Sequence, residues 1–320
     1  MAERRWPEAD LARVRPIPIA TRANKVEPRL LAHPPAADRG FDAFLASLAD
    51  VLAARDLKAV IRATAEAAGK RGVIVQIGGH VIKTGLGPLV LHLMRRRVIT
   101  HLAMNSAASI HDFELAAYGG TSEDVAAGLV DGTFGMARET GEEMNAAIAR
   151  GHAEDRGMGE ALGRYLAGKP GLPGREHSVL VGALELDIPV TVHAAIGTDI
   201  IHQHPHADGA ALGATSFRDF KRLAAGLPAL HDGGVVLNVG SAVIMPEVFL
   251  KALTVARNLG GGRPTGFTAC DFDMIRHYRP RMNVVERPTL GSGKGYAVTG
   301  HHEILLPLFV WGVDAALGQG

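Results

Sequence analysis

Several histidines stand where short apolar runs of the sequence end, at positions suited to acid–base chemistry. The chain has 320 residues and 15 histidines. An imidazole titrates close to neutral pH, so a histidine in such a place could accept or release a proton during a reaction. The predicted catalytic histidines are His80, His111, His204 and His302.

Three of the histidines alternate along one segment. His202, His204 and His206 are separated by single residues, and alternate side chains of an extended chain point the same way. Imidazoles with a carboxylate are normal ligands for zinc or iron, so one interpretation is a metal site. A second is metal-free acid–base catalysis, for example by His204 with Asp208. A third is a solvent-exposed, histidine-rich loop, and the sequence leaves all three open.

A lysine and two glutamates are further candidates for contact with a substrate. Lys294 falls in the glycine-rich stretch 291–295, which predicts a flexible turn beside the site. Burial there would lower its pKa and allow an imine with a carbonyl carbon, whereas a solvated or phosphate-contacting lysine is the alternative. Glu114 and Glu247 could bind a cationic substrate. The stretch 121–124 is typical of a helix N-cap with acids in the first turn.

One unit recurs along the chain: a short apolar run, a turn of small residues, and a helix. The predicted strands cover 73–77, 101–104, 190–195, 235–239 and 266–269. The predicted helices cover 41–54, 58–68, 84–97, a stretch from about 109, and 246–258. This alternation predicts a Rossmann-like, doubly wound α/β fold with a mostly parallel sheet and helices on both faces. Ligands of such sheets bind beyond the carboxyl ends of the strands, where the small-residue turns lie.

The chain divides into a short arm and one domain. Residues 1–37 hold six prolines and predict an N-terminal arm, and 38–320 predict a single domain. Within it, 141–177 is charged and punctuated by glycine, which favours a helical excursion over a second domain. The single cysteine, Cys270, excludes a disulfide framework within the chain and a multi-cysteine zinc site, and we expect it to be buried.

Composition narrows the class of protein. The formal net charge is +1, so no global field would attract nucleic acid or a membrane surface. The local basic run Arg95–Arg97 comes at the end of a predicted helix, where cations are favoured. The apolar stretch 304–313 is too short to span a bilayer, and 47% hydrophobic residues are enough for a large core. We therefore expect a cytoplasmic protein without nucleic-acid or membrane partners.

Seven segments, read in order, resemble motifs of the deoxyhypusine synthase family, whose members use NAD. They are Asp38-Arg39-Gly40-Phe41-Asp42, Gly78–Gly85, Met104–Asp112, Ile188-Pro189-Val190, Gly240-Ser241-Ala242-Val243-Ile244, Thr268–Asp273, and Gly293–Ala297 with Leu305–Val310. The resemblance implies an NAD-binding domain and a homotetramer built of dimers, with sites at the interfaces. By position, the cofactor contacts would be Gly79, Ser106, Ala107, Ala108, Asp112, Thr268, Ala269 and Asp273.

The chain also departs from that family's pattern. The stretch 282–287 has neither the catalytic lysine nor the tryptophan before it, and Pro246-Glu247 stands where the family has a base histidine. Val298 replaces the aspartate of the closing motif. We therefore expect an NAD-dependent transferase or oxidoreductase with a different small substrate that bears an amine or a hydroxyl. The alternatives are a metal-dependent hydrolase or lyase using His202–His206, and a binding protein without catalysis.

Overall fold

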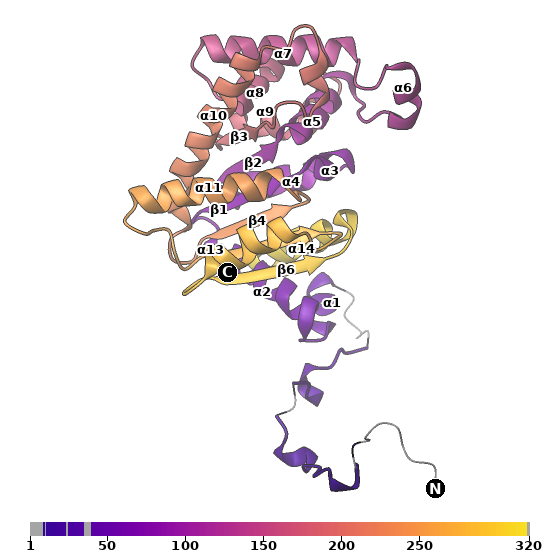
Figure 1. Ribbon diagram of the computed structural model, residues 1–320, viewed down its shortest axis with the longest axis vertical. Helices are drawn as coiled ribbons and strands as arrows, with labels where there is room; N and C mark the ends of the chain where they lie inside the picture. Colours follow the sequence, from indigo (N-terminus) through magenta and orange to yellow (C-terminus); the bar gives the residue numbers. More distant parts are fainter. Residues whose placement is uncertain (1–8, 10, 24, 35–39, 319–320) are drawn as a thin grey trace.

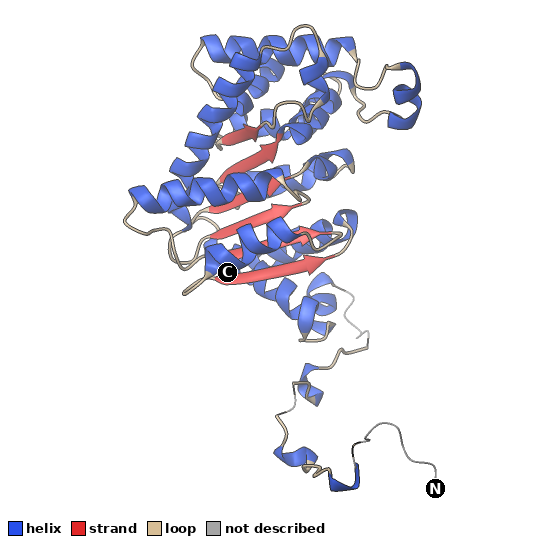
Figure 2. Ribbon diagram, viewed as in Figure 1, coloured by secondary structure: helices blue, strands red, loops and turns tan. Residues whose placement is uncertain are grey.

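A computed structural model describes residues 9, 11–23, 25–34 and 40–318 and places one parallel sheet at the centre of the chain (Figures 1 and 2). The strands are β1 Val73–Ile77, β2 His101–Asn105, β3 Val190–His193, β4 Val235–Val239, β5 Thr268–Asp273 and β6 Lys294–Thr299. They lie in the order β3-β2-β1-β4-β5-β6, and each pairs with its neighbours in parallel. This is the strand order of a doubly wound Rossmann-like sheet, so the predicted fold class is confirmed.

Helices cover both faces of the sheet, which explains why the central strands are apolar throughout. On one face lie α2 Leu52–Ala67, α4 Gly87–Arg95, α9 Val179–Glu185 and α14 His302–Gly318. On the other lie α10 Gly209–Gly226 and α11 Ile244–Leu259. Successive residues of β1 divide between the two apolar clusters, with Val75 and Ile77 in one and Ile74 in the other. Every residue of β1 is buried, as expected for a strand covered on both sides.

Most helices between β1 and β3 gather around the β2–β3 side of the sheet. They are α3 Gly79–Lys83, α5 Ser106–Tyr118, α6 Val125–Asp131, α7 Arg138–Ala153 and α8 Met158–Gly168. The predicted helical excursion over 141–177 thus corresponds mainly to α7 and α8. Figure 1 shows α6 standing out from the body beside α5 and α7. The expected helix 84–97 begins later, because Gly85 adopts a φ of 81° between α3 and α4.

The expected helix 41–54 is broken into two. α1 covers Phe41–Ser47, and α2, which takes in the second expected helix, begins at Leu52. In the gap the N–H of Asp50 donates to the carbonyl oxygen of Leu30 at 3.0 Å. The prediction is wrong here because apolar spacing carries no information about a backbone bond to a distant segment.

The last part of the sheet also differs from expectation. β5 does not end at Ala269 but continues to Asp273, and a sixth strand, β6, begins at Lys294 in place of the expected turn. β6 is an edge strand whose residues are mostly half-buried or exposed, so it lacks the continuous apolar run of the inner strands. The intervening chain forms α12 Tyr278–Pro280, a π-helix Arg281–Glu286 (η7) and α13 Arg287–Thr289.

The N-terminal arm extends away from the body in Figure 1 over its described residues. Its described part holds short 3₁₀ turns at Leu11–Arg13, Ile19–Thr21 and Pro28–Leu30 (η1 to η3). Asp38 and Arg39 of the opening motif lie outside the described residues, so the boundary at residue 38 stays a prediction. In the part of the chain that the structure describes, no helix is long and apolar enough to cross a membrane.

Candidate functional site

The turns after β1 and β4 meet at the point where the strand order reverses. A Cβ on Gly78 would lie 1.9 Å from the carbonyl oxygen of Gly240, so these two backbones touch. Gly240 itself has a φ of 65°, a conformation that favours glycine. Packing therefore requires glycine at 78, and the backbone conformation favours it at 240. The switch point between these two turns, here called the crevice, is where doubly wound sheets bind ligands.

Two of the predicted catalytic histidines lie together at this crevice. The ring centroids of His80, on α3, and His302, at the start of α14, are 5.5 Å apart. Nε2 of His302 lies 3.2 Å from the carbonyl oxygen of Phe272, and since a carbonyl only accepts, Nε2 carries the proton. Burial lowers the pKa of His302, so its Nδ1 bears a lone pair, and that buried atom has no hydrogen-bond partner among the described residues.

A cavity of about 530 Å³ opens beside the crevice, between α3, α5, the start of α7 and the loop after β3. The ionisable side chains that line it are Lys83, His111, Glu114, Tyr118, Glu123 and Asp199. The crevice and the cavity adjoin, because a Cβ on Gly79 would lie 3.4 Å from Cδ2 of His111. The volume suits a small molecule.

A chain of hydrogen bonds runs through one wall of this cavity. Nδ1 of His111 lies 2.7 Å from Oγ1 of Thr121, and that hydroxyl donates to Oε2 of Glu114 at 2.5 Å. Oε1 of Glu114 accepts from the Thr140 hydroxyl at 3.0 Å. Burial is the main cause that lowers the pKa of His111, with further contributions from the charges of Lys83 and His80. The imidazole is therefore neutral near pH 7 and able to accept a proton.

The N-terminus of α5 faces a carboxylate of the protein itself. Ser106 donates its hydroxyl hydrogen to Asp199, and the side chain of Asn105 accepts from the N–H of Ala108 at 3.0 Å. Ala107 lies on the cavity wall. Asp199 thus supplies negative charge to the N-terminus of α5. The predicted cofactor contacts there are Ser106, Ala107 and Ala108.

The other predicted cofactor residues fall in three places. Asp112 is buried under α9, where its carboxylate accepts from the Ser178 hydroxyl at 2.6 Å and from two backbone N–H groups. Thr268 and Ala269 begin β5, at the edge of the sheet opposite the crevice. Asp273 ends the same strand at the crevice edge, and its Oδ1 accepts from the N–H of Met274 at 2.7 Å.

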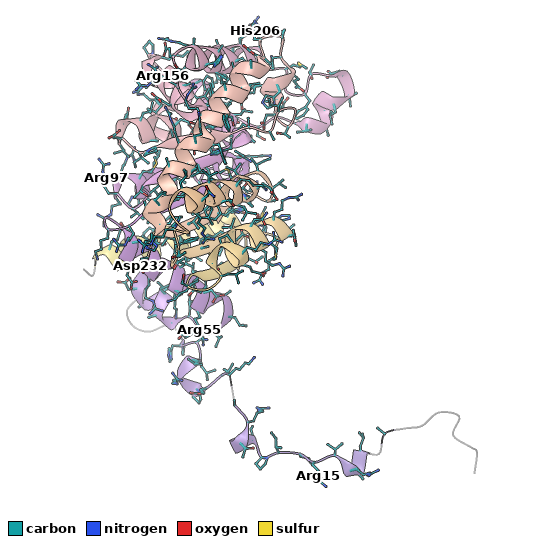
Figure 3. The ribbon with its side chains drawn as sticks, turned by 60° about the vertical axis from the view of Figure 1, so that its left-hand side comes forward. Arg15, Arg55, Arg97, Arg156, His206 and Asp232 are labelled. Atoms are coloured by element: carbon teal, nitrogen blue, oxygen red, sulfur yellow. The ribbon has the colours of Figure 1, made fainter. Side chains whose placement is uncertain are left out.

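The alternating histidines do not converge. Nδ1 of His202 accepts from the N–H of Gly197 at 3.1 Å, and Nε2 of His204 donates to the carbonyl oxygen of Gly135 at 2.8 Å. His206 is exposed at the outer end of the body (Figure 3). Among the described residues, no three His, Cys, Asp or Glu side chains are grouped to hold a metal ion. The prediction that spacing would align the three rings is wrong, because the chain forms a 3₁₀ turn at Ile200–Gln203 (η5) and not a strand.

The remaining candidates lie away from the cavity. Lys294 begins β6 opposite Thr268, at the far edge of the sheet. Glu247 pairs with Lys251 on its own helix, and its Oε1 accepts from Nε of Arg279 at 3.1 Å. Cys270 is buried, as expected.

Several residues at the cavity were not predicted from the sequence. The stretch 121–124 was expected to cap a helix through Thr121, but the N-cap of α6 is Asp124, whose carboxylate accepts from the N–H of Ala127 at 3.1 Å. This leaves Thr121 for His111. Lys83 and Asp199 follow strands β1 and β3, and this position after a strand end could have identified them as candidates. Nothing in the sequence places Thr140 at the cavity.

Several solved structures share the fold of this chain. A provisionally assigned deoxyhypusine synthase from Entamoeba histolytica is 9% identical, with a TM-score of 0.55, over 86% of this chain and 93% of that one. AgrE in its ternary complex with ornithine and NAD+ is 15% identical, with a TM-score of 0.51, over 84% of this chain and 35% of that one. A provisionally assigned LOR/SDH protein from Methanococcus maripaludis S2 is 15% identical, with a TM-score of 0.50, over 83% and 69%.

These likenesses establish the fold, and the predicted resemblance to deoxyhypusine synthase holds at that level. The chain spans about a third of the length of AgrE. No protein-family model matches the sequence, and no curated protein matches it.

Proposed function

We propose that this protein is an NAD-dependent enzyme, a transferase or oxidoreductase acting on a small substrate that bears an amine or a hydroxyl. The observation that carries the proposal is the juxtaposition of two features at the carboxyl edge of the sheet. One is the glycine crevice between β1 and β4, and the other is the cavity that holds the neutral imidazole of His111. A cofactor site beside a substrate site is the arrangement that hydride transfer needs.

The residues at the crevice fit a dinucleotide. The unpartnered Nδ1 of His302 is a buried acceptor, which a ribose hydroxyl or a carboxamide N–H would satisfy. Gly79 allows close approach of a backbone, and the carboxylate of Asp273 can accept from hydroxyl groups. When bound, NAD would supply a hydride acceptor. AgrE, which shares the fold, was solved with ornithine and NAD+, and this also supports the proposal.

The protein's own contribution to the reaction would lie in the cavity. His111 would take the proton from the substrate hydroxyl or amine as the neighbouring carbon loses a hydride, which leaves a carbonyl or an imine. Three cavity carboxylates, of Glu114, Glu123 and Asp199, against Lys83 favour an amine among the candidate substrates. The proposal gives no role to Lys294, at the opposite edge, or to metal chemistry at the dispersed histidines.

Calorimetric titration of NAD into the full chain tests the proposal. We expect saturable binding that Asp273→Asn weakens by about tenfold, the effect of losing one hydrogen bond to a charged group. Asp187→Asn is the matched control, because Asp187 is exposed and lies after α9 with a φ of 55°, which asparagine tolerates. Absence of binding to the unaltered protein would refute NAD dependence.

The oligomeric state remains a prediction of the family resemblance. We expect a dimer or a homotetramer with the cavity near an interface between subunits. Light scattering on the eluting full chain would give the mass directly, and a monomer at all concentrations would contradict this part of the proposal.

A further inference from the structure

The hydrogen atoms in the wall of the cavity can be assigned from the chemistry of three groups. As a carboxylate, Glu114 only accepts hydrogen bonds, so the single hydroxyl hydrogen of Thr121 goes to its Oε2 at 2.5 Å. The Thr121 oxygen must then accept at its other contact. The group that faces it is Nδ1 of His111 at 2.7 Å, and this nitrogen therefore donates.

We infer that Thr121 and Glu114 hold His111 as its Nδ1–H tautomer and leave Nε2 as the basic nitrogen of the site. In water a neutral imidazole prefers its proton on Nε2, so the protein selects the other form. Among the described residues, no hydrogen bond engages Nε2 of His111. Thr121 and Glu114 are positioning residues in this assignment, since they act on the reacting atoms only through the ring.

The fold holds each member of the chain in place. α5 ends at Tyr118 with a left-handed Gly119, φ 74°, which turns the backbone and returns Thr121 to His111, ten residues earlier. Glu114 lies one helical turn after His111 on α5 and is anchored on its second oxygen by Thr140 of α7. Three separate segments thus fix one ring.

Burial and the basic groups on α3 favour the neutral ring of His111. Lys83 and His80 approach it from α3, and both disfavour its protonation, as burial does. The carboxylates of Glu114, on its own helix, and of Glu123 and Asp199, in the loops before α6 and after β3, act in the opposite sense. The net effect still lowers the pKa of His111. The ring therefore has one nitrogen committed as a donor and one available as an acceptor.

The catalytic role of this tautomer rests on the function proposed above. The O–H or N–H bond of the substrate would break with its proton passing to Nε2, while the adjacent C–H bond would lose a hydride to NAD. The electron pair of the broken O–H or N–H bond becomes the second bond of the carbonyl or imine. The tautomer itself is a property of the protein alone, and it can be tested without a substrate.

The test is ¹⁵N NMR of the full chain labelled in its histidines, at pH 7.5, with the His111 signals identified by their loss in His111→Gln. We expect Nδ1 to carry the proton and Nε2 to give the shift of an unprotonated nitrogen. Thr121→Val should move the majority of the population to Nε2–H, and Thr121→Ser should restore Nδ1–H. Thr133→Val is the matched control, since Thr133 is exposed and outside the cavity, and its hydroxyl donates to Asp131.

A proton on Nε2 in the unaltered protein would overturn the inference, as would a tautomer that Thr121→Val leaves unchanged. If Thr121→Val fails to fold, the unaltered protein and Thr121→Ser still decide between the two tautomers. NAD titration on the same samples separates the two proposals. An Nδ1–H ring without NAD binding would support the tautomer assignment and reject the proposed function. NAD binding with an Nε2–H ring would support the function and reject the tautomer assignment.

Discussion

Asp271 is a carboxyl held in the interior of the sheet, on β5. It is 4% exposed, and its Oδ1 accepts from Nδ2 of Asn238, on the neighbouring strand, at 2.7 Å. Burial is the main cause that raises its pKa to about 7, against an ordinary value of 3.8. The folded state therefore favours the neutral acid, and the contribution of Asp271 to stability is lost as pH rises through about 7.

We expect Asp271→Asn to stabilise the protein at pH 8 but not at pH 4. An asparagine keeps the acceptor for Asn238 and never ionises. The gain at pH 8 should be roughly 2–4 kcal/mol of unfolding free energy, because the pKa of about 7 lies well above the ordinary value of 3.8. Urea unfolding at both values of pH measures the difference. The exposed Asp187→Asn should be neutral at both. An equal effect of Asp271→Asn at the two values would contradict the titration.

At the scale of elements, the close approach of the turns after β1 and β4 limits which residues can stand in those turns. Gly78→Ala would put a Cβ 1.9 Å from the carbonyl oxygen of Gly240, and backbone cannot yield as a side chain can. We expect a loss of about 1–3 kcal/mol in unfolding free energy, measured by urea unfolding, together with weaker NAD binding.

The matched control for this change lies in a helix. Gly213 is in α10, and a Cβ there meets nothing within 4 Å. Gly213→Ala should therefore stabilise the protein by about 0.5–1 kcal/mol, because alanine loses less conformational freedom than glycine. If both alanine variants changed stability in the same direction, the packing argument for Gly78 would fail.

The elements that the sequence predicts well are those whose burial is complete. The strands at 73–77 and 235–239 have the expected bounds, because both of their faces are covered and all residues are apolar or amide. β6 and the end of β5 were missed, because an exposed edge and two buried aspartates break the apolar run. Lys294 was consequently placed at the wrong edge.

The sequence also predicts one part of the candidate site and misses another. His80, His111 and His302 follow or precede strand ends, and a parallel sheet brings such positions to one edge, so the sequence predicts their approach. The contact of His111 with Thr121, and the anchoring of Glu114 by Thr140, depend on a helix terminus and on how α7 packs. No spacing in the sequence predicts either of these two contacts.

At the scale of the whole molecule, buried ionisable groups make stability depend on pH in two opposite ways. Burial raises the pKa of Asp112 to about 6 and of Asp219 and Asp271 to about 7. These acids stabilise the fold fully below their unfolded value of 3.8, and the contribution is lost as pH rises to about 7. Burial lowers the pKa of His101 to about 4 and of His193 to about 3, so their contribution is lost as pH falls below 6.5.

Between pH 4.5 and 6.5 the three acids and the two imidazoles oppose each other. About one acid remains unbalanced, so we expect the unfolding free energy of the unaltered protein to rise by only about 1 kcal/mol per pH unit as pH falls. His101 and His193 both contact the hydroxyl of Thr191 at 3.1 Å, and glutamine can replace each as a polar group that does not titrate.

In the double variant His101→Gln/His193→Gln the acids act unopposed. Its unfolding free energy should therefore rise more steeply as pH falls from 6.5 to 4.5, by roughly 2–4 kcal/mol per pH unit. Urea unfolding followed by circular dichroism at several pH values measures the slope, which is insensitive to a constant cost of the substitutions. The exposed pair His177→Gln/His206→Gln should keep the shallow slope of the unaltered protein. The same shallow slope in the buried double variant would show that the imidazoles do not offset the acids.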